Sequence, residues 1–204
     1  MKIHSHMTQR HHVRGVTMLE VLITLVILAF GLLGIAGLQG RMQVAEVEAY
    51  QRTQAIVLLQ EMVDRIKANP KNSMSYVPAA LGTTTKGTGN ASQNCAALVT
   101  PTQADIDLCE WNNALLGAAE KSGGQSLGVM IGARGCVTNT VATMPREFLV
   151  SVVWQGLAPT VSPDTATTCG NTSYGDDTTR RALVARLTIA CLQNVAGAID
   201  CVTP

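Results

Sequence analysis

The sequence predicts an α+β protein in which a long N-terminal helix, membrane-spanning in its first half, packs against a small antiparallel sheet of three to five strands. Residues 21–40 form an unbroken run of 20 uncharged, mostly apolar residues. At 1.5 Å per residue, such a helix is about 30 Å long, which is the thickness of a bilayer's hydrocarbon core. Farther along, three segments alternate apolar and polar side chains, as strands with one buried face do.

The helical pattern continues well beyond the apolar run. Residues 43–68 are rich in helix formers, and Asn69-Pro70 ends the pattern because the residue before a proline disfavours helical backbone. Apolar side chains recur here at steps of three and four, which places them on one helix face: Ala55, Leu58, Leu59, Met62 and Ile66. We therefore expect a helix over residues 16–69, with residues 16–40 in the membrane and the later turns packed on a head domain formed by residues 70–204.

The head domain is expected to contain one short helix and three strands. Residues 71–100 form a polar connection without clear periodicity. Thr102 and Asp105 resemble a helix capping box, and Gly117 is a suitable helix stop. Residues 156–181 form a polar loop whose length suggests a functional or mobile segment. The strands are expected at residues 127–138, 147–155 and 182–191, with one apolar face each toward the long helix.

Charge and histidine content narrow the classes of function. Lys2, Arg10 and Arg14 precede Gly15 and no acidic residue does, so the positive-inside bias places the N-terminus in the cytoplasm. The rest of the chain has 12 basic and 14 acidic residues, a balance that gives no basic surface for nucleic acid. All four histidines lie in the first 12 residues. If that leader is removed, the mature chain has no histidine for a catalytic triad or a metal site, and we expect no enzyme activity, metal or cofactor.

The six cysteines favour disulfides in an oxidising compartment over a metal site, because their number is even and none forms a close CxxC pair. Six cysteines allow 15 pairings, among which spacing alone cannot choose. The best local pair is Cys95 with Cys109, which would tie the polar connection to the short helix. The next is Cys191 with Cys201, after the last strand, which leaves Cys136 with Cys169.

The segment from Gly15 to Ile23, Gly-Val-Thr-Met-Leu-Glu-Val-Leu-Ile, resembles the N-terminal signal of type IV pilins and related pseudopilins. Three unlike features coincide in it: a short basic leader, a glycine that ends the leader, and a glutamate five residues later inside an apolar run. The resemblance implies that a prepilin peptidase cuts between Gly15 and Val16 and methylates the new N-terminus. Val16 departs from the Phe most often found there.

The resemblance also implies a role for Glu20, the one acidic residue in the apolar segment. A charge inside the hydrocarbon costs about 2.5–3.5 kcal/mol on insertion scales, so an unpaired carboxylate there is unfavourable. In an assembling filament of this family, Glu20 would pair with the N-terminal amine of a neighbouring subunit. A simpler alternative is that Glu20 only complements the positive end of the helix dipole.

Within the superfamily, residues 20–39 and 54–70 resemble the PilV group of minor pilins more than a major pilin. Major pilins commonly carry proline in the apolar half, where this chain has Gly37. This resemblance implies a minor pilin that helps to initiate or modify a type IV pilus, and that supports pilus display, adhesion, twitching motility or DNA uptake. Its expected partners are the prepilin peptidase, other minor pilins, the major pilin and inner-membrane lipid. The chain would cross the inner membrane once, with a periplasmic head, and then enter the pilus at the cell surface.

Two other functions remain open from the sequence. One is a minor pseudopilin of a type II secretion system. The other is a membrane-anchored periplasmic enzyme, for which Asp105, Asp107 and Glu110 would be the acidic cluster, although acids near a helix start are more often dipole partners. Calcium binding by the long loop would use Asp164, Asp176 and Asp177, but their spacing does not match a calcium-binding loop and a solvated loop is favoured.

Overall fold

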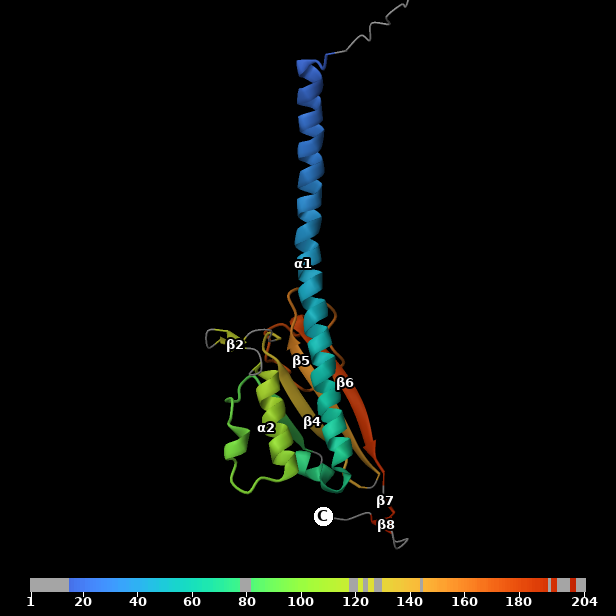
Figure 1. The fold of residues 1–204 in the computed structure, drawn as a ribbon. Helices are drawn as coiled ribbons and strands as arrows, with labels where there is room; N and C mark the ends of the chain where they lie inside the picture. Colours follow the sequence, from blue (N-terminus) through green and yellow to red (C-terminus); the bar gives the residue numbers. More distant parts are fainter. Residues whose placement is uncertain are drawn as a thin grey trace, which may run out of the picture. The chain divides into compact units, whose positions relative to one another are not determined.

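The structure is a computed structural model that describes residues 15–77, 82–117, 121–122, 125–126, 130–143, 145–190, 192–193 and 199–200. It divides into two units, residues 1–45 and 46–204, which are described separately. Helix α1 (Met18–Ala68) contributes to both (Figure 1). The helix expected over residues 16–69 is therefore present, and it starts two residues later than expected.

In the first unit, α1 is apolar on every side. It has a mean hydropathy of 2.7 over its most apolar window, and by length and composition it is the one helix among the described residues that could cross a membrane. Large apolar side chains are exposed along this part of the helix; Leu19, Phe30 and Leu38 are 67%, 71% and 60% exposed. So much apolar surface in contact with water would be costly, because each buried side chain of this size gains about 1.5–3 kcal/mol.

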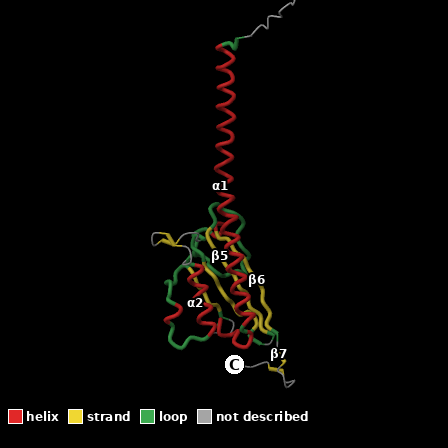
Figure 2. Tube along the Cα trace, in the orientation of Figure 1, coloured by secondary structure: helices red, strands yellow, loops and turns green. Residues whose placement is uncertain are grey.

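The second unit is a four-stranded antiparallel sheet covered on one face by helices (Figure 1). The strand order is β1-β4-β5-β6, and the bounds are Thr83–Gly87, Arg134–Val141, Arg146–Gln155 and Arg180–Ile189. The covering helices are the later turns of α1 and α2 (Gln103–Leu115). Figure 2 separates these helices from the strands by colour.

Short elements complete the second unit. The 3₁₀ turns are Pro70–Tyr76, Cys95–Ala97 and Asp177–Thr179. Two pairs of two-residue strands lie outside the main sheet, β2 with β3 (Lys121–Ser122, Gln125–Ser126) and β7 with β8 (Leu192–Gln193, Ile199–Asp200).

The main core lies between these helices and the sheet. The predicted apolar face of α1 is buried in it, with Ala55, Met62 and Ile66 fully inaccessible. Trp111 of α2 is also fully buried, and its indole N–H donates to the carbonyl oxygen of Leu58 at 2.9 Å. From the sheet come the alternating side chains of β5 and β6 that the sequence indicated: Phe148, Val150, Val152, Trp154, Leu187 and Ile189. Helix α2 is therefore held against α1 both by the burial of Trp111 and by the hydrogen bond of its indole N–H.

The expected short helix is confirmed. Thr102 caps α2: its hydroxyl accepts from the Asp105 backbone N–H at 3.2 Å, and the Asp105 carboxylate accepts from the Thr102 N–H at 2.9 Å. The Thr102 hydroxyl also donates to the Asp105 carboxylate, and this bond, together with the one from the Thr102 backbone N–H, holds the pKa of Asp105 below its usual range. Gly117 ends the segment with a positive φ of 67°, which glycine adopts without strain.

The first expected strand, at residues 127–138, was wrongly placed. Residues 127–129 lie outside the described residues, and the chain turns before β4 begins at Arg134 and runs to Val141. In the turn, Gly132 has a φ of +63°, and the Ala133 N–H donates to the Met130 carbonyl oxygen at 3.2 Å. A left-handed residue cannot continue an extended strand. The third expected strand, at residues 182–191, lies at Arg180–Ile189 instead.

The second half of the polar loop expected at residues 156–181 is partly packed against the sheet. A disulfide joins Cys169 to Cys136 of β4, and with Val153 these residues form a second buried cluster on the sheet face opposite α1. Tyr174 packs against this cluster, and its hydroxyl donates to the Gly132 carbonyl oxygen at 2.7 Å. Arg180 is also buried and donates to the carbonyl oxygens of two loop residues. This half of the loop is a structural cover for the sheet.

Candidate assembly site

The N-terminal end of α1 brings together the residues that the sequence singled out for processing and assembly. Gly15, Val16 and Thr17 are exposed and precede the helix, which begins at Met18. The Val21 N–H donates to the Thr17 carbonyl oxygen at 3.3 Å, as the first i to i+4 bond of a helix does. Thr17 is therefore the N-cap residue. Only Val16 separates it from the expected cut after Gly15.

The Thr17 side chain strengthens this helix start. Its hydroxyl oxygen accepts from the Glu20 backbone N–H at 3.3 Å, which satisfies one of the donors that a helix leaves free in its first turn. The order Thr-Met-Leu-Glu is the sequence pattern of a capping box. Sequence reasoning had found Glu20 but not Thr17, although this four-residue pattern just before an apolar run was a usable signal.

Glu20 lies in the first turn of α1 with its side chain exposed. A carboxylate at this position interacts favourably with the positive end of the helix dipole, by about 0.3–1 kcal/mol. Exposure also leaves both oxygens accessible to a group on another molecule. The geometry thus permits both roles that the sequence suggested for Glu20.

The acidic residues considered for an enzyme site have structural partners. Asp107 and Glu110 lie 2.8 and 2.7 Å from the Arg65 guanidinium, which also pairs with Glu61 at 2.7 Å. The buried Tyr76 hydroxyl donates to the second Asp107 oxygen, and burial followed by this hydrogen bond raises the pKa of Tyr76. Asp105 is held in the cap of α2. The cluster therefore joins α1, the turn after it and α2.

The acidic residues considered for calcium binding make local hydrogen bonds or ion pairs with residues close to them in the chain. Asp164 accepts from the Ala166 N–H at 2.7 Å, and Asp176 accepts from the Thr178 N–H at 3.0 Å. Asp177 pairs with Arg180 at 2.6 Å, and this hydrogen bond lowers the pKa of Asp177. Within the described residues there is no group of three or more His, Cys, Asp or Glu side chains arranged to hold a metal ion.

Two of the predicted disulfide pairings are present: Cys95 with Cys109, and Cys136 with Cys169. No cysteine is free within the part of the chain that the structure describes. The predicted pair of Cys191 with Cys201 lies outside it. The first disulfide ties the loop after β1 to α2, and the second ties the long loop to β4, so each fixes an irregular segment to a regular element.

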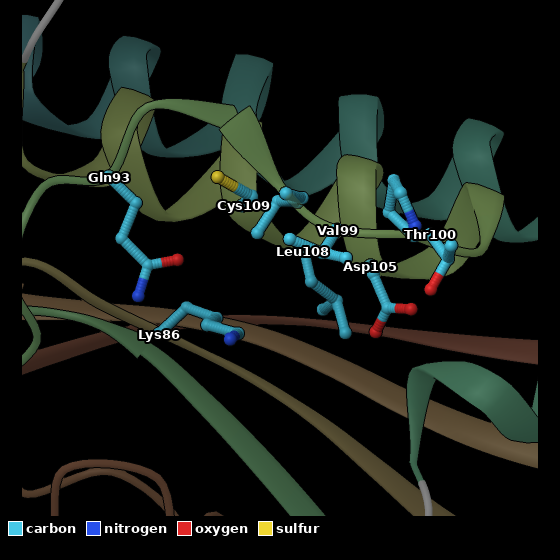
Figure 3. Close-up of a pocket in the computed structure, with 9 residues that line it drawn as sticks. Lys86, Gln93, Val99, Thr100, Asp105, Leu108 and Cys109 are labelled. Carbon is cyan, nitrogen blue, oxygen red and sulfur yellow. The ribbon is translucent and has the colours of Figure 1, made fainter. Parts of the chain in front are cut away.

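A surface pocket lies beside the first disulfide (Figure 3). Lys86 of β1, Gln93, and Leu108 and Cys109 of α2 are among the residues that line it. The remaining walls are formed by Asp105 and by the loop of Leu98, Val99, Thr100 and Pro101. Because Asp105 is held in the cap and Cys109 in a disulfide, neither is available as a base or a nucleophile.

Comparison with known families agrees with this arrangement. A model of the prokaryotic N-terminal methylation motif matches residues 10–36, and a model described as type IV pilin Tt1218 matches residues 37–109. The chain belongs to the type IV pilin superfamily. No curated protein and no solved structure matches it.

Membership fixes the general role of this type IV pilin. The family is structural and not enzymatic. The methylation motif implies processing by a prepilin peptidase and assembly with other pilins, and it fits membrane anchoring through the apolar part of α1. The fold, a long N-terminal helix packed on a four-stranded antiparallel sheet, is that of a type IV pilin.

Proposed function

We propose that this pilin is a minor pilin of the PilV type, which helps to initiate or modify a type IV pilus. The observation that carries the proposal is the exposed apolar half of α1 with a single accessible carboxylate, Glu20, in its first turn. The apolar surface serves first to anchor the subunit in the inner membrane and then to pack among the helices of neighbouring subunits. Through the pilus, the subunit supports surface display, adhesion, twitching motility or DNA uptake.

Processing comes first in this proposal. The prepilin peptidase cuts between Gly15 and Val16, in the exposed segment before α1. The N-terminus stays cytoplasmic because three basic residues precede the apolar run. A periplasmic head agrees with the two disulfides, which persist in oxidising compartments. Intact mass of the membrane-extracted protein tests the cut: a chain that still contains His11 and His12 would refute it.

Glu20 then acts in assembly. The cut creates a positive amine on Val16, and in the pilus the Glu20 carboxylate pairs with the amine of a neighbouring subunit. Removal of one member of a buried pair leaves the other charge unpaired, at a cost of about 3–5 kcal/mol. A subunit without Glu20 should therefore insert and be cleaved, but should fail to enter the pilus or its initiating complex.

The test compares Glu20→Ala, Glu20→Gln and Glu46→Ala. Gln keeps the shape and capping ability of Glu without its charge, because either residue suits this position of a capping box. Glu46 is an exposed acid farther along the same helix and serves as the matched control. We expect both Glu20 variants to be missing from sheared pili, and Glu46→Ala to be present at the wild-type level. Incorporation of Glu20→Gln at the wild-type level would show that Glu20 is only a helix-capping residue.

A minor pseudopilin of a type II secretion system is the second candidate, because its N-terminal signal is the same. The two roles differ in what a deletion removes. Loss of pili or twitching with normal export of secreted enzymes supports the minor pilin. Normal pili with enzymes retained in the periplasm would replace it with the pseudopilin.

A further inference from the structure

We propose that Thr17 is a positioning residue for prepilin processing. Its hydroxyl makes α1 begin at Met18, and so it keeps the Gly15–Val16 peptide bond outside the helix, where a peptidase can reach it. The inference rests on the proposed cleavage after Gly15. It assigns a task to a residue that lies beyond the cut and is kept in the mature chain. The model of the prokaryotic N-terminal methylation motif matches residues 10–36, a range that includes this helix start.

The hydrogen bonds define where the helix starts. The first carbonyl group used by α1 is that of Thr17, which accepts from Val21, and the Thr17 hydroxyl accepts from Glu20. Among the described residues, no backbone N–H donates to the carbonyl oxygen of Gly15. This carbonyl belongs to the peptide bond that would be cut, and it is therefore free for polarisation and attack.

A helix that started two residues earlier would remove this freedom. With Gly15 as the N-cap, its carbonyl oxygen would accept from the Leu19 N–H, in the i to i+4 pattern. Gly15 is an acceptable N-cap, about as good as threonine, so the earlier start is a real competitor. An apolar surrounding favours it further, because backbone groups there need internal partners. The Thr17 hydroxyl opposes this extension because its capping bond stabilises the helix that begins at Met18.

The size of the effect follows from the capping bond. Loss of an N-cap side chain changes helix stability by about 1 kcal/mol, which is about a fivefold change in the ratio of the two helix starts. Thr17→Val keeps the shape of threonine and removes only the hydroxyl. We expect it to slow cleavage by up to about fivefold, the limit set by this change in ratio, and Thr17→Ala to act similarly. Thr17→Ser and Thr17→Asn, which cap well, should be cut at nearly the wild-type rate.

The experiment uses the full-length prepilin in detergent micelles with purified prepilin peptidase, and follows the intact mass over time. The Cα chemical shift of Val16 reports in parallel whether this residue has become helical. Thr24→Val is the matched control, because the Thr24 hydroxyl donates to the Val21 carbonyl oxygen inside the helix, away from the cap. It should be cleaved at the wild-type rate.

The outcomes separate this inference from the proposed function. If the Ser and Asn variants are as slow as the Val variant, the peptidase recognises threonine itself and the capping role is refuted. Cleavage of Thr17→Val at the wild-type rate also refutes it. If the wild-type chain is not cut after Gly15 at all, the proposed processing fails instead.

Discussion

The Arg65 guanidinium of α1 lies 2.8 Å from the Asp107 carboxylate of α2, and Asp107 is only 4% exposed. The same carboxylate accepts from Gln103 at 3.0 Å and from the Tyr76 hydroxyl. One buried charge is thus surrounded by partners from both helices and from the turn between them. A buried carboxylate held in this way is costly to leave unpaired.

Arg65→Ala should therefore destabilise the head by about 3–5 kcal/mol, because it leaves Asp107 buried without its cation. Lys67→Ala is the matched control: Lys67 pairs with Asp64 at 3.8 Å on the surface, and both side chains are more than half exposed. Such pairs contribute about 0–1 kcal/mol. Urea denaturation of the full chain in detergent measures both. Equal losses in the two variants would show that burial of Asp107 does not matter.

Stability should fall at high pH as the buried Tyr76 and the partly buried Tyr174 ionise. Burial raises the pKa of Tyr174 to about 12, and burial with the Asp107 contact raises the pKa of Tyr76. A tyrosine with a raised folded pKa holds its proton more tightly in the folded state. Its contribution is complete below the ordinary value of about 10 and is lost as the pH rises through the folded value. The thermal midpoint of the wild type should thus decline above about pH 10. Measured from its own midpoint at neutral pH, Tyr174→Phe should decline less.

Loss of the Cys136–Cys169 disulfide should cost more than loss of the Cys95–Cys109 disulfide. The first closes a separation of 33 residues and the second closes 14. On the chain-entropy model, each is worth about 2–4 kcal/mol and the longer loop about 0.8 kcal/mol more. The first also holds the cluster around Val153. Paired Cys→Ser variants, compared by urea denaturation, test the order, and the reverse order would contradict the structural role given to residues 167–180.

Gly135→Ala should destabilise the core by about 1–3 kcal/mol through overpacking. A Cβ atom at this position of β4 would overlap the Trp111 ring and the Leu115 side chain. Gly31→Ala, on the apolar part of α1, meets nothing within 4 Å and is the control. Near-ultraviolet circular dichroism should show a disturbed Trp111 only in the first variant. An unchanged spectrum and midpoint for Gly135→Ala would mean that the core has room there.

Much of the fold could be predicted because its signals are local. The stripe on α1, the capping box of α2 and the alternation in β5 are each complete within one element. Strand β1 was missed because its residues, Thr-Thr-Thr-Lys-Gly, show no apolar alternation. Its stabilising contacts are long-range: the Thr83 hydroxyl lies 3.0 Å from that of Thr138, and the Gly87 N–H donates to the side chain of Asn112.

The contacts described at the candidate site also divide into local ones, which the sequence indicates, and long-range ones, which it does not. Thr17 and Glu20 are three residues apart, and their capping pattern can be recognised in the sequence. Arg65 and Asp107 are 42 residues apart, and no spacing rule relates them before the helices pack. The second face of the sheet was misjudged for a similar reason. Its cover is a polar loop in which few side chains turn inward, among them Cys169, Tyr174 and Arg180, and these are too few for a periodic signal.

The two disulfides join cysteines that are consecutive in the chain, so neither loop encloses the other. An oxidase that joins each cysteine to the next one as the chain emerges makes both native bonds directly. Biogenesis of these two bonds then depends on the speed of oxidation and needs no later shuffling of wrong pairs. A cell without disulfide isomerase should make both at the normal yield, whereas a cell without the oxidase should accumulate the reduced and more easily degraded subunit.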